Sequence, residues 1–534
     1  MHINQIGYRP NDIKIAVSTV YSDSFSIFEK STGKLAFSGC LSKGKYDECS
    51  GDFLYYIDFS QMQSPGIYYI YVNNGAISYE FKIDNNIYKD IKNAFLKFLY
   101  YQRCGCNLEE KYAGVWSHVA CHTKESYIWD DENTKIDTIG GWHDAGDYGR
   151  YTVPIAVTIE HLLLAYEFFP QKFKEPVNIP ESGNNIPDIL NEARYGLEWL
   201  HTIQDSKSGG VYHKITSDVY PPIDMLPEND YFKFYISPVS ATATADFIAV
   251  MSKASVIFSD FDNAFSVKCL KSAQKAWTWL INNEKYPAFK NPDRILTYEY
   301  PDNDDKDERF WAACELYKAT GDAEYHNYIK SMINKEKFDL VGLGWDDVGA
   351  FGTLAYITTK KFETDEIIYD TLKNCFLDRA NSLLNLAKDD GYMVSLCKDN
   401  YDWGSNMILL KNSTHLIIAS CLTNNPNYCN SALDHFHYLL GRNALSQSYV
   451  TGYGSKPIKY PHQRQCMANI SSDPIPGMVV GGPNLITLDD TTKDLFIGRP
   501  PAKCFEDNNK CFSTNEVATY WNTPAIFVSA YFDE

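Results

Sequence analysis

Two aspartates lie three residues apart in a glycine-rich stretch, Gly140-Gly-Trp-His-Asp-Ala-Gly-Asp-Tyr-Gly-Arg-Tyr. Asp144 and Asp147 in this arrangement could hold one water between them and take its proton, or they could bind calcium. Aspartates that precede a helix also serve as helix caps, so the residues alone leave a purely structural role open as well. The stretch is therefore a candidate for a general base, and we expect it to lead into a helix.

A second carboxyl candidate, Glu516, ends the run Ser513-Thr-Asn-Glu and precedes an apolar segment. The pattern predicts a helix from Glu516 to Tyr531, in which Glu516 would be a first-turn acid that helix termini favour. Its apolar and aromatic neighbours would also raise the pKa of the carboxyl group and make it a proton donor near neutral pH. Both interpretations fit the residues.

Two further patterns carry polar chemistry. The segment 448–464 ends with His462 and Arg464, an imidazole and a cation that suit the orientation of sugar hydroxyls, although a solvated loop fits equally. A second set combines two thiols and two imidazoles, the donor set of a closed structural zinc site: Cys104, Cys121, His122 and His143. The spacings of 17 and 21 residues are not those of a zinc finger, and Cys106 could compete with Cys104. Buried free cysteines with surface histidines are the alternative.

The elements that must position these residues change in kind along the chain. Residues 1–85 contain short β-rich runs separated by turn residues, a spacing that predicts a small β-sandwich. From residue 86 to residue 534 apolar residues recur at helical spacing, with about a dozen helices and no intervening strands. We therefore expect a helical barrel or solenoid. The long polar loops between the helices are candidates for function: 112–147, 204–236, 441–466 and 472–515.

Composition excludes several classes of protein. The chain has 534 residues, 44% of them hydrophobic and 22% charged, as in an ordinary soluble protein of two domains. No apolar run approaches the ~20 residues of a spanning helix, so we expect no membrane partner. The net charge of -19 argues against a nucleic-acid partner. The opening residues carry no secretory signal, which predicts a cytoplasmic protein, or a secreted one if a signal was removed.

Taken together, these residues resemble glycoside hydrolase family 9, the inverting cellulase family, over essentially the whole chain. Asn4-Gln-Ile-Gly-Tyr-Arg-Pro resembles the opening of the immunoglobulin-like domain that precedes the catalytic domain in one branch of that family. The stretch Asp144-Ala-Gly-Asp resembles the family's catalytic-base motif. The segments around His462 and Glu516 match both family signatures. Gln463 and Thr523 depart from the usual residues at permissive positions.

The resemblance implies an (α/α)6 barrel behind an immunoglobulin-like sandwich. It implies that Asp147 is the general base, that Asp144 helps to hold the water and that Glu516 is the general acid. The residues implied as sugar contacts are His462, Arg464, Asp507 and Trp521. It also implies a structural zinc ion on Cys104, Cys121, His122 and His143. Calcium is common in the family, and Asp302, Asp304 and Asp307 form an acidic loop to which no ligand role is assigned.

The function implied is inverting hydrolysis of β-1,4-glucan, as cellulose or cello-oligosaccharides, by a monomer. An exo-β-D-glucosaminidase that cleaves chitosan oligosaccharides is an alternative on the same fold, and it would need an additional carboxylate near the cationic terminal sugar. A carbohydrate-binding protein without catalytic activity is an alternative of another class. The presence of Asp144, Asp147 and Glu516 together argues against that last alternative.

Overall fold

The computed structural model describes residues 1–73, 75–469 and 473–533. The first residue of the predicted loop 472–515 therefore lies outside the described residues. The chain forms two compact units, one made of Met1–Phe98 together with Ala380–Glu534 and the other of Leu99–Arg379. The first unit is thus discontinuous in sequence. The domain division that we place between residues 85 and 86 stays a prediction.

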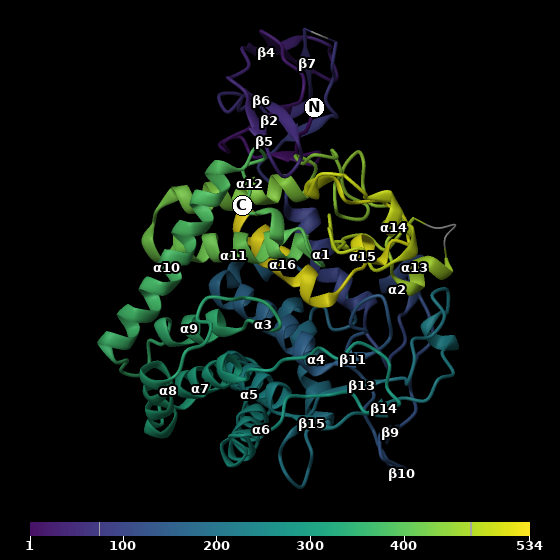
Figure 1. The fold of residues 1–534 in the computed structure, drawn as a ribbon, viewed down its shortest axis with the longest axis vertical. Helices are drawn as coiled ribbons and strands as arrows, with labels where there is room; N and C mark the ends of the chain where they lie inside the picture. Colours follow the sequence, from purple (N-terminus) through teal and green to yellow (C-terminus); the bar gives the residue numbers. More distant parts are fainter. Residues whose placement is uncertain (74, 470–472, 534) are drawn as a thin grey trace. The chain divides into compact units, whose positions relative to one another are not determined.

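An all-β domain of two sheets begins the first unit and is drawn in purple in Figure 1. One sheet has the order β1-β8-β7-β3-β4 and the other the order β2-β6-β5. Apolar residues alternate along β7, Gly66–Val72, so that Tyr68, Ile70 and Val72 face a core shared by both sheets. The remaining strands are β1 Gly7–Tyr8, β2 Ile15–Ser18, β3 Phe25–Glu29, β4 Leu35–Gly39, β5 Lys45–Asp47, β6 Asp52–Asp58 and β8 Phe81–Ile83.

Helices make up most of the rest of the first unit. α11, Ser405–Thr423, packs against α12, Pro426–Leu439, and against α16, Thr519–Phe532. A buried ion pair of 2.5 Å between Lys92 and Asp533 ties α1, Lys89–Tyr101, to the residue that follows α16. Three short helices occupy the long loops: α13 Arg464–Ala468, α14 Asp490–Leu495 and α15 Phe512–Asn515.

The second unit is built around α5, Ala241–Ile257, which contacts α3, α6 and α7. An apolar window in Ala241–Asp260 is long enough to cross a membrane, but 89% of it is buried inside the protein, as in the core helix of a soluble protein. The other helices are α2 Glu110–Ala113, α3 Thr152–Phe168, α4 Asp188–Thr202, α6 Asn263–Asn282, α7 Lys306–Thr320, α8 Ala323–Lys335 and α9 Gly349–Ile357 (Figure 1). α10, Glu366–Asp389, runs across the boundary between the units.

The expectation that no strands lie between the helices is wrong. The loops that we predicted at 112–147 and 204–236 contribute strands to a sheet of order β10-β9-β14-β13-β11 and to the pair β12-β15. Six of these strands have only two or three residues, too few to show a period, and the longer β10 is almost entirely polar. The strands are β9 Ser126–Ile128, β10 Asp131–Ile136, β11 Arg150–Tyr151, β12 Val211–Tyr212, β13 Lys214–Thr216, β14 Tyr235–Ile236 and β15 Val239–Ser240. The 3₁₀ turns are Gly114–Trp116, Pro170–Phe173, Pro227–Asn229, Phe258–Asp260, Lys398–Asn400 and Pro501–Lys503.

Candidate active site and metal centre

Asp144 and Asp147 lie in a loop of the second unit, and after the two-residue strand β11 the stretch leads into helix α3, Thr152–Phe168, as we expected. The backbone N–H of Asp144 donates to the carbonyl of Gly149 at 3.0 Å, and the chain then continues into strand β11. Gly149 N–H donates to Oδ2 of Asp147 at 3.0 Å. A Cβ on Gly149 would come within 2.7 Å of that oxygen, so only glycine fits here. The loop holds both carboxylates nearly buried, with exposed fractions of 1% and 8%.

Two tyrosines hold the two carboxylates. The hydroxyl of Tyr151 donates to Oδ2 of Asp147 at 3.1 Å, and the hydroxyl of Tyr300 donates to Oδ2 of Asp144 at 2.6 Å. The two rings meet edge to face, with their centroids 5.0 Å apart. Burial, followed by the negative charge of Asp147, raises the pKa of Tyr151 well above its usual range. Both hydroxyls are therefore donors at neutral pH, and each aspartate is oriented by a fixed partner.

Glu516, in the first unit, lies in an extended link and not in a helix. α15 ends at Asn515 and α16 begins at Thr519, while Glu516 has φ −61° and ψ 149°. The backbone on both sides is fixed, because His462 N–H donates to the carbonyl of Asn515 and Gly481 N–H donates to that of Glu516, each at 2.8 Å. The expected helix start at Glu516 is thus wrong, since these bridges compete with helical hydrogen bonds.

The indole of Trp403 orients the Glu516 side chain. Its Nε1–H donates to Oε2 of Glu516 at 2.9 Å, and its ring lies 5.8 Å from that of Phe512. Trp521, a predicted sugar contact, has an exposed fraction of 4%. Its indole packs so closely against Gly404 and Gly481 that a Cβ at either glycine would come within 3.2 Å of it. Trp521 therefore supports the segment that carries Trp403, and its contact with sugar stays a prediction.

The first unit also contains the predicted sugar contacts His462, Arg464 and Asp507. His462 Nδ1 lies 2.7 Å from the carbonyl of Asn509. Because a carbonyl only accepts, the neutral ring carries its hydrogen on Nδ1 and a lone pair on Nε2. Arg464 begins α13 and is 4% exposed. The Asp507 carboxylate accepts from the backbone N–H groups of Lys459 and Tyr460, each at 2.9 Å, so it fixes the loop that leads to His462.

The predicted cysteine and histidine set comes together in the second unit. The four donor atoms lie within 4.8 Å of one another. His122 Nδ1 is 3.4 Å from Cys104 Sγ and 3.4 Å from His143 Nε2, and Cys121 Sγ is 3.6 Å from His143 Nε2. Donor atoms about 2.0 to 2.3 Å from one tetrahedral ion lie roughly 3.3 to 3.8 Å apart. The set therefore fits a closed tetrahedral metal site, and no other group of metal-binding side chains among the described residues is this compact.

Asp230 supports this candidate metal site. Its Oδ2 lies 3.2 Å from Nε2 of His122, and its side chain is fully buried. Since Nδ1 of His122 points to the other donors, Nε2 carries the hydrogen and donates to the carboxylate, which is the usual outer partner of a metal-binding histidine. His122 adopts φ 47°, in the left-handed region that is strained for most residues. The hydrogen bond to Asp230 helps to hold this conformation.

A buried acidic cluster includes part of the acidic loop to which the sequence assigns no ligand role. Asp246 and Glu308 are completely buried, and the carboxyl oxygens of Asp246 have no hydrogen-bond partner among the described residues. Burial, followed by the charges of Asp302 and Asp307, raises the pKa of Asp246 well above its usual range. Burial also raises the pKa of Asp307 to about 7. Asp304, by contrast, is exposed and pairs with Lys306 at 2.8 Å.

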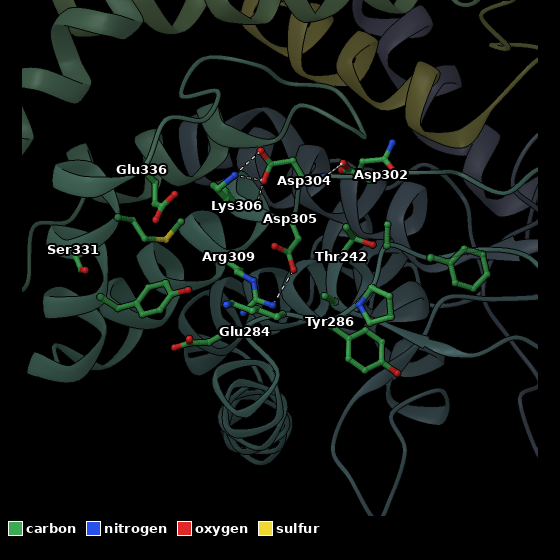
Figure 2. A pocket seen from close by; sticks show the side chains of 18 residues that line it. Thr242, Glu284, Tyr286, Asp302, Asp304, Asp305, Lys306, Arg309, Ser331 and Glu336 are labelled. Atoms are coloured by element: carbon green, nitrogen blue, oxygen red, sulfur yellow. Dashed lines mark hydrogen bonds and ion pairs between the residues drawn. The ribbon is translucent and has the colours of Figure 1, made fainter.

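A pocket of about 470 Å³ borders this acidic segment. Figure 2 shows its side chains, including the ion pairs Asp304–Lys306 and Asp305–Arg309. Asp302 also lines the pocket, whereas Asp144 and Asp147 do not. The pocket is therefore a neighbour of the acidic cluster and not the site of the candidate base.

Three residues that contact the candidate carboxyl groups were not predicted from the sequence. Tyr151 lies four residues after Asp147, and this short spacing in a turn could have suggested the contact. Tyr300 and Trp403 are separated from their carboxylate partners by more than a hundred residues, 156 and 113 respectively. No local signal in the sequence links them to those partners.

Comparison with known proteins identifies relatives over the whole chain. Residues 88–529 match the family described as glycosyl hydrolase family 9, and residues 1–76 match the cellulase N-terminal ig-like domain. A cellodextrinase of Butyrivibrio fibrisolvens is 34% identical over 98% of both chains. Other curated relatives are named endoglucanase or cellobiosidase.

Solved structures agree with these matches. A single mutant of a thermostable endoglucanase from Alicyclobacillus acidocaldarius superposes with a TM-score of 0.93 at 36% identity, covering 100% of this chain and 99% of the other. A zinc-binding triple mutant of a family 9 endoglucanase gives a TM-score of 0.92 at 30% identity over 98% and 99% of the two chains.

Proposed function

Because the chain belongs to glycosyl hydrolase family 9 and is a β-1,4-glucan hydrolase, we propose that Asp147 is its general base and Glu516 its general acid. The predicted fold class, a mainly helical catalytic domain after an N-terminal all-β domain, is confirmed by the same relatives. They give no support to a glucosaminidase or to a protein without catalytic activity.

The observation that carries the proposal is how the carboxyl groups are held. Both hydrogen bonds to Asp147, from Gly149 N–H and the Tyr151 hydroxyl, fall on Oδ2. Oδ1 is then the oxygen that takes a proton from water. Tyr300 fixes Asp144 in the same loop, where it helps to hold that water. The Trp403 indole orients Glu516, which protonates the departing glycosidic oxygen.

These roles amount to inverting hydrolysis. The base draws a proton from water while the water attacks the anomeric carbon, and the acid protonates the leaving sugar on the opposite face. This requires carboxyl groups roughly 6.5 to 9.5 Å apart, whereas a retaining enzyme places them about 5 to 5.5 Å apart and forms a covalent sugar ester. A second aspartate that holds water beside the base supports water as the direct nucleophile.

The stereochemical outcome tests this mechanism. From a β-linked cello-oligosaccharide the first product is expected to be the α-anomer, because a single displacement by water inverts the anomeric carbon. Proton NMR of the anomeric signals in the first minutes, before mutarotation, measures it. The same reaction with a known retaining β-glucanase is the control. Initial formation of the β-anomer would remove the base role of Asp147 and leave the family membership standing.

We further propose soluble cello-oligosaccharides as the preferred substrates. The support is the cellodextrinase relative, which matches 98% of its own length. A panel of cellobiose to cellohexaose, carboxymethylcellulose and chitosan oligosaccharides, read by product chromatography, separates the possibilities. Faster turnover of the polymer than of the oligomers contradicts this preference. Release of glucosamine from chitosan would restore the glucosaminidase alternative.

Zinc is the ion that we propose for Cys104, Cys121, His122 and His143. Two thiolates and two imidazoles at these distances suit tetrahedral zinc, which would be structural because all four positions are filled by protein. His143 directly precedes Asp144, and its N–H donates to the carbonyl of Gln102 at 2.8 Å. The ion would therefore pin the start of the loop that carries both aspartates.

Loss of this ion is expected to destabilise the protein. Cys121→Ala should abolish stoichiometric zinc in protein purified without added metal and lower Tm on the order of 10 °C, since an ion at about 1,000 times its Kd contributes roughly 4 kcal/mol. Cys269→Ala is the matched control, because Cys269 is also completely buried but lies outside the set. Metal analysis and thermal melting measure both. Wild-type protein that holds no zinc and melts unchanged after chelation would refute the site.

Calcium is proposed for the cluster of Asp246, Asp302, Asp307 and Glu308. Several buried carboxyl groups close together are costly to ionise, and a divalent cation would offset that cost. Their oxygens are less closely gathered than the donors of the zinc set. Calcium takes six to eight oxygens, including backbone carbonyls and water, so the carboxylates need supply only some of them. Asp304 is no longer part of this proposal, because it pairs with Lys306. The metal analysis described for zinc also measures the calcium content of the purified protein.

A further inference from the structure

Three side chains in or next to strand β13 hold the segment 297–299. Lys214 Nζ donates to the carbonyl of Tyr298 at 2.6 Å, to Oγ1 of Thr297 at 3.1 Å and to the carbonyl of Thr297 at 3.3 Å. Thr216 adds a hydroxyl bond of 3.1 Å to Thr297. His213 Nε2 lies 3.0 Å from the carbonyl of Glu299. Lys214 is completely buried, so its ammonium group exchanges water for these acceptors.

The segment held by Lys214 leads directly into Tyr300. Tyr300 adopts φ 50°, in the left-handed region, which costs on the order of 1 kcal/mol or more for a residue with a side chain. Such a conformation persists only where its surroundings fix it. The bonds from Lys214 to the two carbonyls just before Glu299 supply that constraint. The resulting direction of Tyr300 places its hydroxyl 2.6 Å from Oδ2 of Asp144.

Lys214 also contacts the tyrosine that holds the other aspartate. Tyr151 is its direct partner across strands β11 and β13. The Lys214 ammonium lies 5.3 Å from the centroid of the Tyr151 ring, within the range of a cation–π interaction. Burial lowers the pKa of Lys214 to about 7, and the negative charges of Asp147 and Glu299 act in the opposite direction. The lysine is therefore electrostatically linked to the carboxylate as well as to the ring.

We infer that Lys214 is a positioning residue for the water-activating carboxylates. It fixes Tyr300 and Tyr151, and these two tyrosines orient Asp144 and Asp147. This inference rests on the proposed roles of the two aspartates. It gives a role in hydrolysis to a lysine that lies far from both aspartates in sequence. Among the described residues, no hydrogen bond joins this lysine to either aspartate.

Lys214→Met tests the inference, because it keeps the length of the side chain and removes its donors and charge. kcat on cellopentaose is expected to fall roughly 10- to 100-fold, as misplacement of a reacting group by about 1 Å does, while KM changes less than threefold. Lys214→Arg retains a cation with several donors and is expected to recover part of kcat. In the double variant of Lys214→Met and Tyr300→Phe, the loss of kcat should be smaller than the sum of the two single losses in free energy, because both substitutions act through one contact.

Lys14→Met is the matched control. Lys14 is also completely buried and donates to the carbonyls of Pro10 and Asp12 at 2.7 and 2.8 Å, but it belongs to the N-terminal β domain. This variant is expected to lose stability and keep kcat within about twofold. If Lys214→Met does not fold by circular dichroism, Thr297→Val, which removes the hydroxyl shared by Lys214 and Thr216, is measured by the same criteria.

The outcomes separate this inference from the proposed function. An unchanged kcat in Lys214→Met, a rise in KM alone, or fully additive effects with Tyr300→Phe would each overturn the positioning role. If Asp147→Asn itself keeps wild-type activity, the base assignment fails instead. Loss of activity in Asp147→Asn together with an unchanged Lys214→Met removes only the inference about the lysine.

Discussion

Asp147→Asn is expected to lower kcat on cellopentaose by at least about 10² to 10⁴-fold, the typical contribution of a positioned general base. The substitution keeps the shape of the side chain. Its amide oxygen can still accept from Gly149 N–H and the Tyr151 hydroxyl, which directs the amide NH₂ toward the position of Oδ1. An NH₂ group at that position cannot take a proton from water. The variant should therefore keep the structure of the loop and lose the general-base step.

Steady-state kinetics and thermal melting check this result. Asp130→Asn is the control, because Asp130 is an exposed aspartate of the same unit. Asp147→Gly in the presence of formate adds a second test, since a small carboxylate can replace the missing base in the space that the side chain leaves. Activity of Asp147→Asn within threefold of wild type, with a normal Tm, would rule out the base role.

Glu516→Gln is expected to lose about 10² to 10⁴-fold in kcat on cello-oligosaccharides but much less on 2,4-dinitrophenyl β-cellobioside. The phenolate of that substrate departs without protonation, so it does not need the acid. The glutamine side chain keeps an oxygen that can accept from the Trp403 indole, which preserves the local geometry. Comparison of the two substrates therefore separates an acid from a base, because Asp147→Asn should lose activity on both.

Glu506→Gln is the control for the acid, since Glu506 is an exposed glutamate of the same unit. A Glu516→Gln variant that loses activity equally on both substrates would assign Glu516 to a different role. A variant with normal activity on cello-oligosaccharides would remove it from the chemistry altogether.

Much of the fold and the metal centre could be predicted because the signals are local or chemical. Helical periodicity predicted that the chain after residue 86 is mainly helical, because the apolar residues of helices such as α5 must be buried. The cysteine and histidine set could be predicted from donor types alone, although its spacing follows no compact motif. His143 adjoins the glycine-rich loop, so the chain itself brings this ligand to the candidate base.

Other features depend on contacts between distant segments. α16 begins at Thr519 and not at Glu516 as predicted, because His462 and Gly481 form hydrogen bonds with the backbone around Glu516. These two partners lie 54 and 35 residues before Glu516 in the chain. Tyr300 takes its direction from a left-handed backbone fixed by Lys214. Neither periodicity nor turn composition reports such pairing, so sequence reasoning found the carboxylates but not the residues that orient them.

The discontinuity of the first unit has a consequence for biosynthesis. Leu99–Arg379 is continuous and leaves the ribosome before Ala380–Glu534, so the second unit, with its cysteine and histidine set, can form while translation continues. The first unit cannot close until Asp533 is available to Lys92. At about 5 to 20 residues per second the N-terminal β domain waits roughly 20 to 90 s until the final segments are complete. During this interval the nascent chain exposes the surfaces that the C-terminal helices of the first unit later cover.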